Sequence, residues 1–536
     1  MKHGARIVSA VAGLMWAATA CGSADLSGNA AGFGPAAEDG GTSAPSGSGG
    51  SSGGYGGGTS ADSGPPEIKV EDAYQSPVST GQYVWVANPS SGRVAYIQAA
   101  TLAVATVAAG DGPTYLAAVP DATADSAIVM NVRSHDATLL RASGGALTTA
   151  TFPLAADLNA WSVSADGRWA LAWGDATRAT SPDPTQGFQD VSVLDLSGAV
   201  PPTIVSVGYR PVKVTFSSDA SRAFAVTQDG ISVIDLTGAA PLVTKNFPVT
   251  SDPSQDPSTE DVSITPDGTY ALVRTDGSPT VNVVALSDGR LTPVTLPANA
   301  TDLTLTPAGD RALVVLRDVS TVVTLPVPGI AANPASYTTL LLPGQTVGRA
   351  IVADDGVTAL LFTTVLPVDS MIVLDLATQQ FRTEPLHLPV LAVFPTHDAS
   401  TAIVLHTLPA DAGTSAQGAF SVAPVGANLP AKLVGTDAPP NAVALSPASD
   451  RAVVTTRDDG LQVYAAYLAK MPSLEVDRFS LASPPIGAGV VAGANVAWIA
   501  QSNPEGRITF IDLVTSAART LTGFELGSRV VDGSQP

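Results

Sequence analysis

The chain of 536 residues contains a single cysteine, Cys21, which excludes intramolecular disulfides, Cys-x-x-Cys redox chemistry and cysteine-based zinc clusters. Basic residues are also scarce, because 26 Lys and Arg stand against 47 Asp and Glu, a net charge of −21. Such an acidic chain repels phosphate backbones, so nucleic-acid binding is disfavoured. Only 14% of the residues are charged and 45% are hydrophobic, which indicates a globular protein.

Catalytic motifs are missing as well. The sequence has no G-x-S-x-G elbow, no H-E-x-x-H zinc helix and no C-x-x-C-H haem site, and nothing in it predicts a cofactor. Ser134, His135 and Asp136 are adjacent, and neighbouring residues of a strand point to opposite faces, so they do not form a triad. The acidic loop 251–261 carries oxygen donors, but its prolines and the lack of EF-hand spacing favour a solvated loop over a calcium site.

The N-terminus predicts a signal peptide at residues 1–20. Lys2, His3 and Arg6 precede an apolar stretch of 12 residues, 7–18, which is too short to span a bilayer. The sequence Ala-Thr-Ala-Cys at 18–21 resembles the lipobox of bacterial lipoproteins, and this resemblance implies lipidation of Cys21. We therefore expect an envelope protein that meets the membrane only through its lipid anchor. Ordinary signal cleavage, which would give a secreted protein, is the alternative.

A linker separates this anchor from the rest of the chain. Residues 21–65 are rich in Gly and Ser, and such a segment cannot bury enough apolar surface to fold, so we expect it to be disordered. Its reach is roughly 35–40 Å by random-coil scaling. The domain boundaries are thus a signal peptide at 1–20, lipidated cysteine and linker at 21–65, and one folded domain at 66–536.

The folded domain repeats a hairpin signature. An apolar strand, a turn with Asp or Gly and a second apolar strand recur, for example at 160–173, 212–226 and 261–274, and successive turns lie 41 to 53 residues apart. Apolar residues alternate within each strand, and helical periodicity is absent. Four short antiparallel strands in about 45 residues describe a β-propeller blade. We predict an all-β fold, a single closed β-propeller of four-stranded blades with about ten repeat units.

The repeat resembles a known family. YVWVAN at 83–88, the V-x-V-[IL]-D-L strands and the S-x-D-G turns are similar to the YVTN-type β-propeller repeat, which is related to surface-layer and WD-like propellers. The resemblance covers roughly residues 83–531. It implies the architecture and leaves the function open, since the fold hosts both binding proteins and enzymes.

Closure of the ring is a separate expectation. The opening unit, 83–108, shows three strands and no first strand, whereas residues 528–531 are a surplus strand at the other end. We expect the surplus strand to complete the opening blade and leave no free edge. Two smaller propellers, or fewer blades with side hairpins, are the alternatives.

The candidate site follows from strand direction. In a propeller, the loops from second to third strands and the loops between blades share one face, and several of these positions carry arginine. Such residues suit an anionic or polar ligand, although pairing of Arg with Asp along the blade rims is the more economical interpretation. The candidate ligand-binding residues are Arg133, Tyr209, Arg210, Arg274, Arg317, His406 and Arg457.

These features favour a non-catalytic, lipid-anchored propeller of the cell envelope that binds a protein or a polysaccharide. Propeller lactonases and lyases share the scaffold, so an enzyme with an Arg/His/Asp site on the channel face is the second hypothesis. A surface-layer-type structural component is the third. The oligomeric state is not predicted.

Overall fold

The computed structural model describes residue 67 and residues 79–178, 186–249, 260–408, 416–524 and 530–535. The predicted signal peptide, Cys21 and the linker 21–65 lie outside the described residues, as do residues 251–259 of the acidic loop.

The first five blades contain strands β1 to β19. Their bounds are β1 Tyr83–Asn88, β2 Arg93–Gln98 and β3 Ala103–Ala108; β4 Pro113–Val119, β5 Asp125–Asn131, β6 Asp136–Ser143 and β7 Ala146–Pro153; β8 Ala160–Val163, β9 Trp169–Trp173, β10 Asp190–Asp195 and β11 Thr203–Ser206; β12 Pro211–Phe216, β13 Arg222–Thr227, β14 Gly230–Asp235 and β15 Leu242–Phe247; β16 Glu260–Ile264, β17 Tyr270–Thr275, β18 Thr280–Ala285 and β19 Leu291–Thr295.

The other five blades contain strands β20 to β40. Their bounds are β20 Asp302–Leu305, β21 Arg311–Leu316, β22 Thr321–Pro326 and β23 Thr338–Leu341; β24 Arg349–Val352, β25 Thr358–Phe362, β26 Ser370–Asp375 and β27 Phe381–Pro385; β28 Val390–Pro395, β29 Thr401–His406, β30 Gly418–Pro424 and β31 Lys432–Thr436; β32 Pro440–Leu445, β33 Arg451–Asp458, β34 Val463–Lys470 and β35 Glu475–Ser480; β36 Pro485–Val491, β37 Val496–Gln501, β38 Arg507–Asp512, β39 Ala518–Thr522 and β40 Val530–Gln535.

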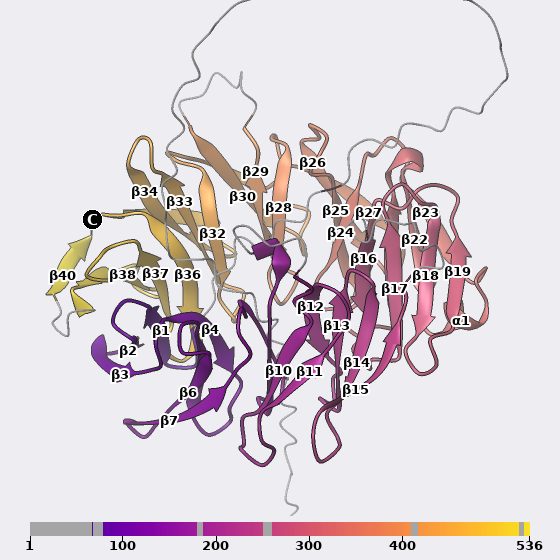
Figure 1. Cartoon of the computed structure of the whole chain (residues 1–536). Helices are drawn as coiled ribbons and strands as arrows, with labels where there is room; N and C mark the ends of the chain where they lie inside the picture. The colour runs from indigo at the N-terminus through magenta and orange to yellow at the C-terminus, as the bar shows by residue number, and fades with distance from the viewer. Residues whose placement is uncertain are drawn as a thin grey trace, which may run out of the picture.

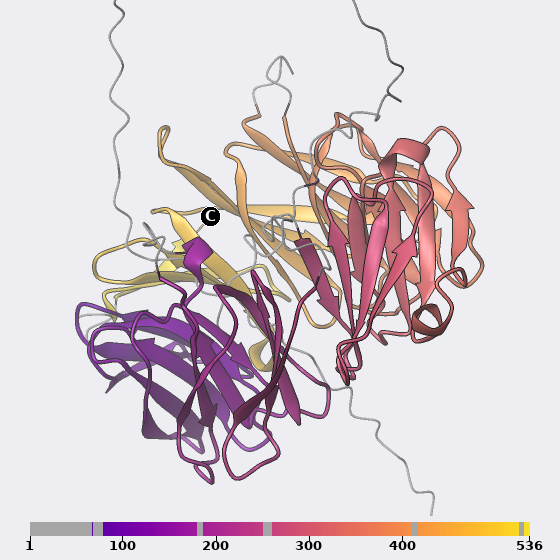
Figure 2. The same cartoon turned by 45° about the vertical axis from the view of Figure 1, so that its right-hand side comes forward.

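Each blade is an antiparallel sheet whose strands pair in chain order. Eight sheets have four strands, the first has three (β1–β3) and the last has five (β36–β40). The blades follow one another around a single ring (Figures 1 and 2). The predicted all-β propeller of ten units is therefore confirmed, and the alternative of two smaller propellers is wrong.

Helical segments are few and short. Among the described residues they are η2 Ala176–Arg178, η4 Arg317–Val319, α1 Gly329–Ala332 and η5 Ala492–Ala494. In the described part of the chain, no helix has the length and apolar character needed to cross a bilayer.

The S-x-D-G turns form through side-chain capping. In the turn between β8 and β9, the Ser164 hydroxyl donates to Asp166 Oδ1 at 2.5 Å and accepts the amide of Trp169 at 2.9 Å. Gly167 has a φ of +69°, a left-handed conformation that glycine adopts without steric strain. Ser217 with Asp219 and Thr265 with Asp267 repeat the Ser/Thr-to-Asp hydrogen bond one and two blades on. This local chemistry explains why the repeat is readable from the sequence.

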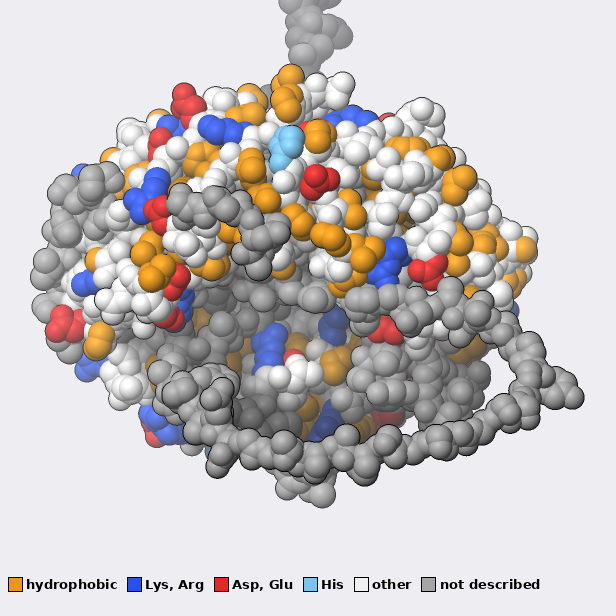
Figure 3. All heavy atoms as spheres, turned by 90° about the horizontal axis from the view of Figure 1, so that it is seen from above, with side chains coloured by type: hydrophobic (Ala, Val, Ile, Leu, Met, Phe, Trp, Pro, Cys, Tyr) orange, Lys and Arg blue, Asp and Glu red, His pale blue; other side chains and the backbone are white. Residues whose placement is uncertain are grey.

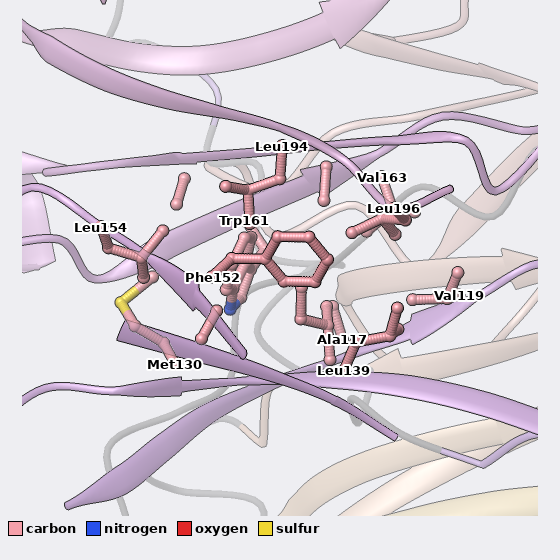
Figure 4. Close-up of a cluster of buried hydrophobic side chains, with 14 of the residues drawn as sticks. Ala117, Val119, Met130, Leu139, Phe152, Leu154, Trp161, Val163, Leu194 and Leu196 are labelled. Atoms are coloured by element: carbon pink, nitrogen blue, oxygen red, sulfur yellow. The ribbon is translucent and has the colours of Figure 1, made fainter. Parts of the chain in front are cut away.

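The core lies between blades. The ten buried hydrophobic clusters of the described residues correspond to the ten junctions of the ring, each joining the facing sides of two consecutive blades. Figure 4 shows one of them, where Met130, Leu139 and Phe152 of the second blade pack against Trp161 and Leu194 of the third. Because no blade buries its faces alone, the ring is stable only as a whole.

Closure of the ring differs from the expectation. The junction between the last and first blades is a packed cluster in which Trp498 and Phe510 contact the group around Val84 and Ile97. The C-terminal strand β40 pairs with β39 as a fifth, outer strand, so the prediction that residues 528–531 complete the opening blade is wrong.

The free edge of β1 is instead paired at one point by Ser79, which forms an antiparallel bridge with Val84. The Ser79 hydroxyl also donates to the carbonyl of Val490 in the last blade at 3.0 Å. Pairing with a residue five positions away closes a far smaller loop than pairing with the other end of the chain, and so loses less conformational entropy.

Candidate binding face

One face of the ring is built from two kinds of loop, those joining the second strand of a blade to its third and those joining consecutive blades. Backbone hydrogen bonds connect the two kinds, for example from Val132 to Gly112 at 3.0 Å, from Gln228 to Tyr209 at 2.9 Å and from Arg457 to Pro439 at 2.9 Å. We call it the channel face. Seen from above, the molecule is hollowed, and Lys and Arg side chains are visible inside the hollow (Figure 3).

The structure places all seven candidate residues on these loops or at the strand ends that feed them. Tyr209 and Arg210 lie between the third and fourth blades, and the other five end a second strand or follow it in the second, fifth, sixth, eighth and ninth blades. The residues in question are Arg133, Arg274, Arg317, His406 and Arg457. They therefore share one face but are distributed around the ring rather than gathered at one point.

Arg133 joins the first two blades. Its Nε donates to Asp111 Oδ1 at 2.9 Å and its Nη2 donates to the carbonyl of Pro89 at 2.5 Å. The side chain remains 54% exposed, so its outer surface is accessible to a ligand from solution.

Arg457 forms a two-pronged ion pair with Asp459. Its Nε lies 2.9 Å from Oδ1 and its Nη2 lies 2.6 Å from Oδ2. The Arg457 hydrogen bond lowers the pKa of Asp459, and the same contact raises the pKa of Arg457. Both groups therefore stay charged near neutral pH, and a fixed, half-exposed guanidinium is presented on the channel face.

Arg274 is enclosed. Its side chain is 9% exposed and contacts Asp276 Oδ1 at 2.5 Å, while the same Nη1 donates to the carbonyl of Ala300 at 3.2 Å. Its Nε lies 3.8 Å from an oxygen of Asp261. These contacts join the fifth blade to the loop that leads to the sixth.

Tyr209 and Arg210 form a local pair. The Arg210 guanidinium carbon lies 5.1 Å from the centroid of the Tyr209 ring, a cation–π distance, and its Nε donates to the carbonyl of Gln186 at 3.2 Å. The Tyr209 amide donates to Asp229 Oδ1 at 2.8 Å. Backbone and side chain together fix this loop on the channel face.

His406 is buried. Its ring nitrogens lie 2.7 Å from the Ser421 hydroxyl and 3.2 Å from the carbonyl of Pro389, and the residue is 3% exposed. Burial lowers its pKa to about 4, because the imidazolium loses its hydration. The imidazole is therefore neutral at pH 7 and held between Ser421 of β30 and the carbonyl of Pro389, where it has little access to a ligand in the channel.

Arg317 has an acidic partner from outside the blades. Its Nη1 lies 2.6 Å from Oε1 of Glu67, and the two side chains are 6% and 1% exposed. Thr363 and Thr364, which follow β25, also donate to this carboxylate. The sequence did not single out Glu67, because an isolated acidic residue just after a Gly/Ser linker belongs to no repeat.

Further buried charges lie beside this pair. Asp302, which is 1% exposed, accepts the amide of Ala350 at 2.8 Å. Arg349 is 4% exposed, and its guanidinium carbon lies 5.3 Å from the centroid of the Phe362 ring. The junction of the sixth and seventh blades thus buries two acidic and two basic side chains, those of Glu67, Asp302, Arg317 and Arg349. Within the described residues, no group of three His, Cys, Asp or Glu side chains is arranged to hold a metal ion.

Comparison with known proteins gives structural likeness only. No protein-family model and no curated protein sequence matches the chain. The structure is similar to a crystal structure of the eukaryotic initiation factor, with a TM-score of 0.49 and 12% identity over 85% of this chain and 97% of that one. It is also similar to the β-propeller domain of Cps50 (Swd1) from Myceliophteria thermophila, with a TM-score of 0.33 and 12% identity over 62% and 95% of the two chains.

The RRP9 WD40 repeats match with a TM-score of 0.33 and 11% identity, over 54% of this chain and 86% of that one. The propeller assignment itself rests on the strand pairing described above.

Proposed function

We propose that this protein is a lipid-anchored, non-catalytic propeller of a bacterial cell envelope whose channel face binds a protein or polysaccharide partner. The observation that carries the binding role is the fixing of the charged groups on that face. Arg133 and Arg457 are held by Asp111 and Asp459 while their outer surfaces remain accessible. Preorganised guanidinium groups recognise anionic or polar groups and lose little entropy on binding.

The same face supports binding over the enzymatic alternative. A general acid or base must reach the proton that it transfers, with a pKa near the working pH. His406 is the only histidine of the candidate set, and it is enclosed, hydrogen-bonded through both nitrogens and shifted to a pKa of about 4. It is therefore a structural residue in this proposal.

The envelope location rests on the sequence. The single cysteine, Cys21, stands directly after a predicted signal peptide and before a linker of 44 residues. The test is fractionation of bacteria that express the full chain or its Cys21→Ser variant. We expect the wild type in the membrane fraction, labelled by an alkyne-bearing fatty acid, and the variant unlabelled and in the soluble fraction. Equal, unlabelled soluble material from both chains would contradict lipidation.

The binding role is tested by photo-crosslinking in the same cells. A photoreactive amino acid replaces Ser91, an exposed residue of the β1–β2 loop whose Pro89 carbonyl accepts from Arg133, or, as a matched control, Leu242, which is 61% exposed on the outer strand β15. We expect a discrete crosslinked product from position 91 and none from position 242. Identical product patterns from the two positions would argue against the channel face as the binding surface.

A further inference from the structure

The contact between Glu67 and the sixth and seventh blades is a complete carboxylate site. Oε1 of Glu67 accepts from Arg317 Nη1 at 2.6 Å and from the Thr363 hydroxyl at 2.8 Å. Oε2 accepts from the Thr364 amide at 2.8 Å and from the Thr364 hydroxyl at 2.9 Å. Four donors, one of them cationic, thus surround the two oxygens, which is the arrangement that a buried carboxylate needs.

The pocket also has a wall shaped for this group. A Cβ atom at Gly348 would lie 1.8 Å from Oε1 of Glu67, so any side chain at position 348 would exclude the carboxylate. The Gly348 backbone is fixed on both sides, because its amide donates to the carbonyl of Phe362 at 2.8 Å and its carbonyl accepts the Thr301 hydroxyl at 2.8 Å. The space is therefore a property of the blades.

The pocket and its occupant have different origins in the chain. All four donors belong to loops that follow β21 and β25, whereas Glu67 precedes the first blade. Ser79, twelve residues after Glu67, already lies at the junction of the last and first blades, and in a ring of ten blades this junction faces that of the fifth and sixth blades across the centre, one junction away from the pocket. Glu67 therefore occupies the pocket as a ligand would, because the residues that form the pocket all belong to the blades.

We propose that the pocket formed by Arg317, Thr363, Thr364 and Gly348 is a binding site for the carboxylate of a glutamate-bearing peptide, with Glu67 as its internal ligand. This proposal rests on the proposed function of the channel face as a binding surface, and it specifies the chemistry of the partner. An internal ligand has a high effective concentration. A partner peptide therefore binds measurably only when it displaces Glu67 or when Glu67 is removed.

The test uses the full chain and a fluorescent peptide with the sequence of residues 65–72, PPEIKVED. We expect saturable binding to the Glu67→Ala and Glu67→Gln variants, and at least tenfold weaker binding to the wild type. A control peptide with Gln in place of its first Glu should bind at least tenfold more weakly to the same variants, and adding Thr363→Val should weaken binding of the original peptide. Thermal melting of each variant establishes that the ring is folded.

Equal binding of the Glu and Gln peptides would overturn the proposal, as would failure of both folded Glu67 variants to bind. Binding of a polyuronate but not of the peptide would also overturn it, because the pocket would then recognise an acidic glycan. Photo-crosslinking from position 91 in wild-type cells reports a partner on the channel face while Glu67 still fills the pocket. A discrete product there, together with no peptide binding, would leave the proposed function standing and remove only the carboxylate site.

Discussion

Arg317 Nη1 lies 2.6 Å from Glu67 Oε1, although the two residues are 250 positions apart. The contact fixes a residue that precedes the blades to a junction on the far side of the ring from the first blade. It also divides the candidate arginines into two kinds, those paired within the ring and one paired with an incoming carboxylate. The predictions below follow from this difference and from the way the ring closes.

Removal of Arg317 should destabilise the ring less than removal of an arginine whose buried carboxylate partner lies inside the ring. Breaking a buried ion pair costs about 3–5 kcal/mol when the remaining charge stays buried. After Arg317→Ala, Glu67 can return to solvent, so we expect a loss of only about 1–2 kcal/mol. The matched control is Arg382→Ala, which leaves the carboxylate of Glu384, 3% exposed, in place within β27, and here we expect about 3 kcal/mol. Urea unfolding measures the free energy of unfolding of both variants. Equal losses would show that Glu67 stays fixed in the ring as an in-ring carboxylate does.

Truncation of residues 527–536 should leave the ring nearly intact. The strand that it removes, β40, pairs only at the outer edge of the last blade, so we expect a loss within about 1 kcal/mol. Trp498→Ala acts on the cluster that joins the last blade to the first, and a large-to-small change there should cost about 3–5 kcal/mol. Thermal and urea melting compare the two. If the truncated chain melts far below the Trp498 variant, the result would support closure of the ring by the C-terminal strand.

The stability of the protein should depend on His406 below neutral pH. Its folded pKa of about 4 lies below the ordinary value of 6.5, so the unfolded chain takes up the proton first. The stabilisation is complete above pH 6.5 and is lost as the pH falls from 6.5 towards 4, by an amount on the order of 3 kcal/mol. His406→Gln keeps a hydrogen-bonding group that does not titrate. The free energy of unfolding of the wild type minus that of the His406→Gln variant, measured from pH 4.5 to 7.5, should therefore shrink as the pH falls. A constant difference would mean that burial does not hold the ring neutral.

The hydrogen bonds in the turn between β12 and β13 predict a second pH effect, on the carboxyl group of Asp219. Hydrogen bonds from Ser217 and Ser221 lower the pKa of Asp219 to about 2. Ser217→Ala removes the largest contribution, and we expect the pKa of Asp219 to rise towards its ordinary value. A carbon-detected NMR titration of the carboxyl group measures it. Ser143→Ala, at the end of β6, is the control and should leave Asp219 unchanged. An unaltered pKa in the Ser217 variant would show that the hydroxyl does not stabilise the carboxylate.

The sequence predicted the fold well, for a physical reason. Strand alternation and Ser/Thr-to-Asp turns such as Ser164 with Asp166 are local. The alternation recurs from blade to blade and the turn recurs in six blades, so many weak signals support one another. Closure was predicted wrongly because both the inner edge of β1 and the outer edge of β39 offer unpaired backbone, and alternation does not distinguish between them.

The candidate site was predictable in position and not in its contacts. Strand direction places Arg133, Arg274 and Arg457 at one face, and the short spacing of Arg274 to Asp276 and Arg457 to Asp459 makes their pairing plausible from the sequence. Glu67 could not be found in this way, because its contact with Arg317 depends on where a segment outside the repeat lies on the ring.

The measurement that tests the account most directly is the yield of the crosslinked product from position 91 in cells that express either the wild-type ring or the Glu67→Gln variant. If the channel face binds a partner and Glu67 occupies part of that site, the yield of the same product should rise when Glu67 no longer competes. An unchanged yield, or loss of the product from a folded variant, would contradict the account.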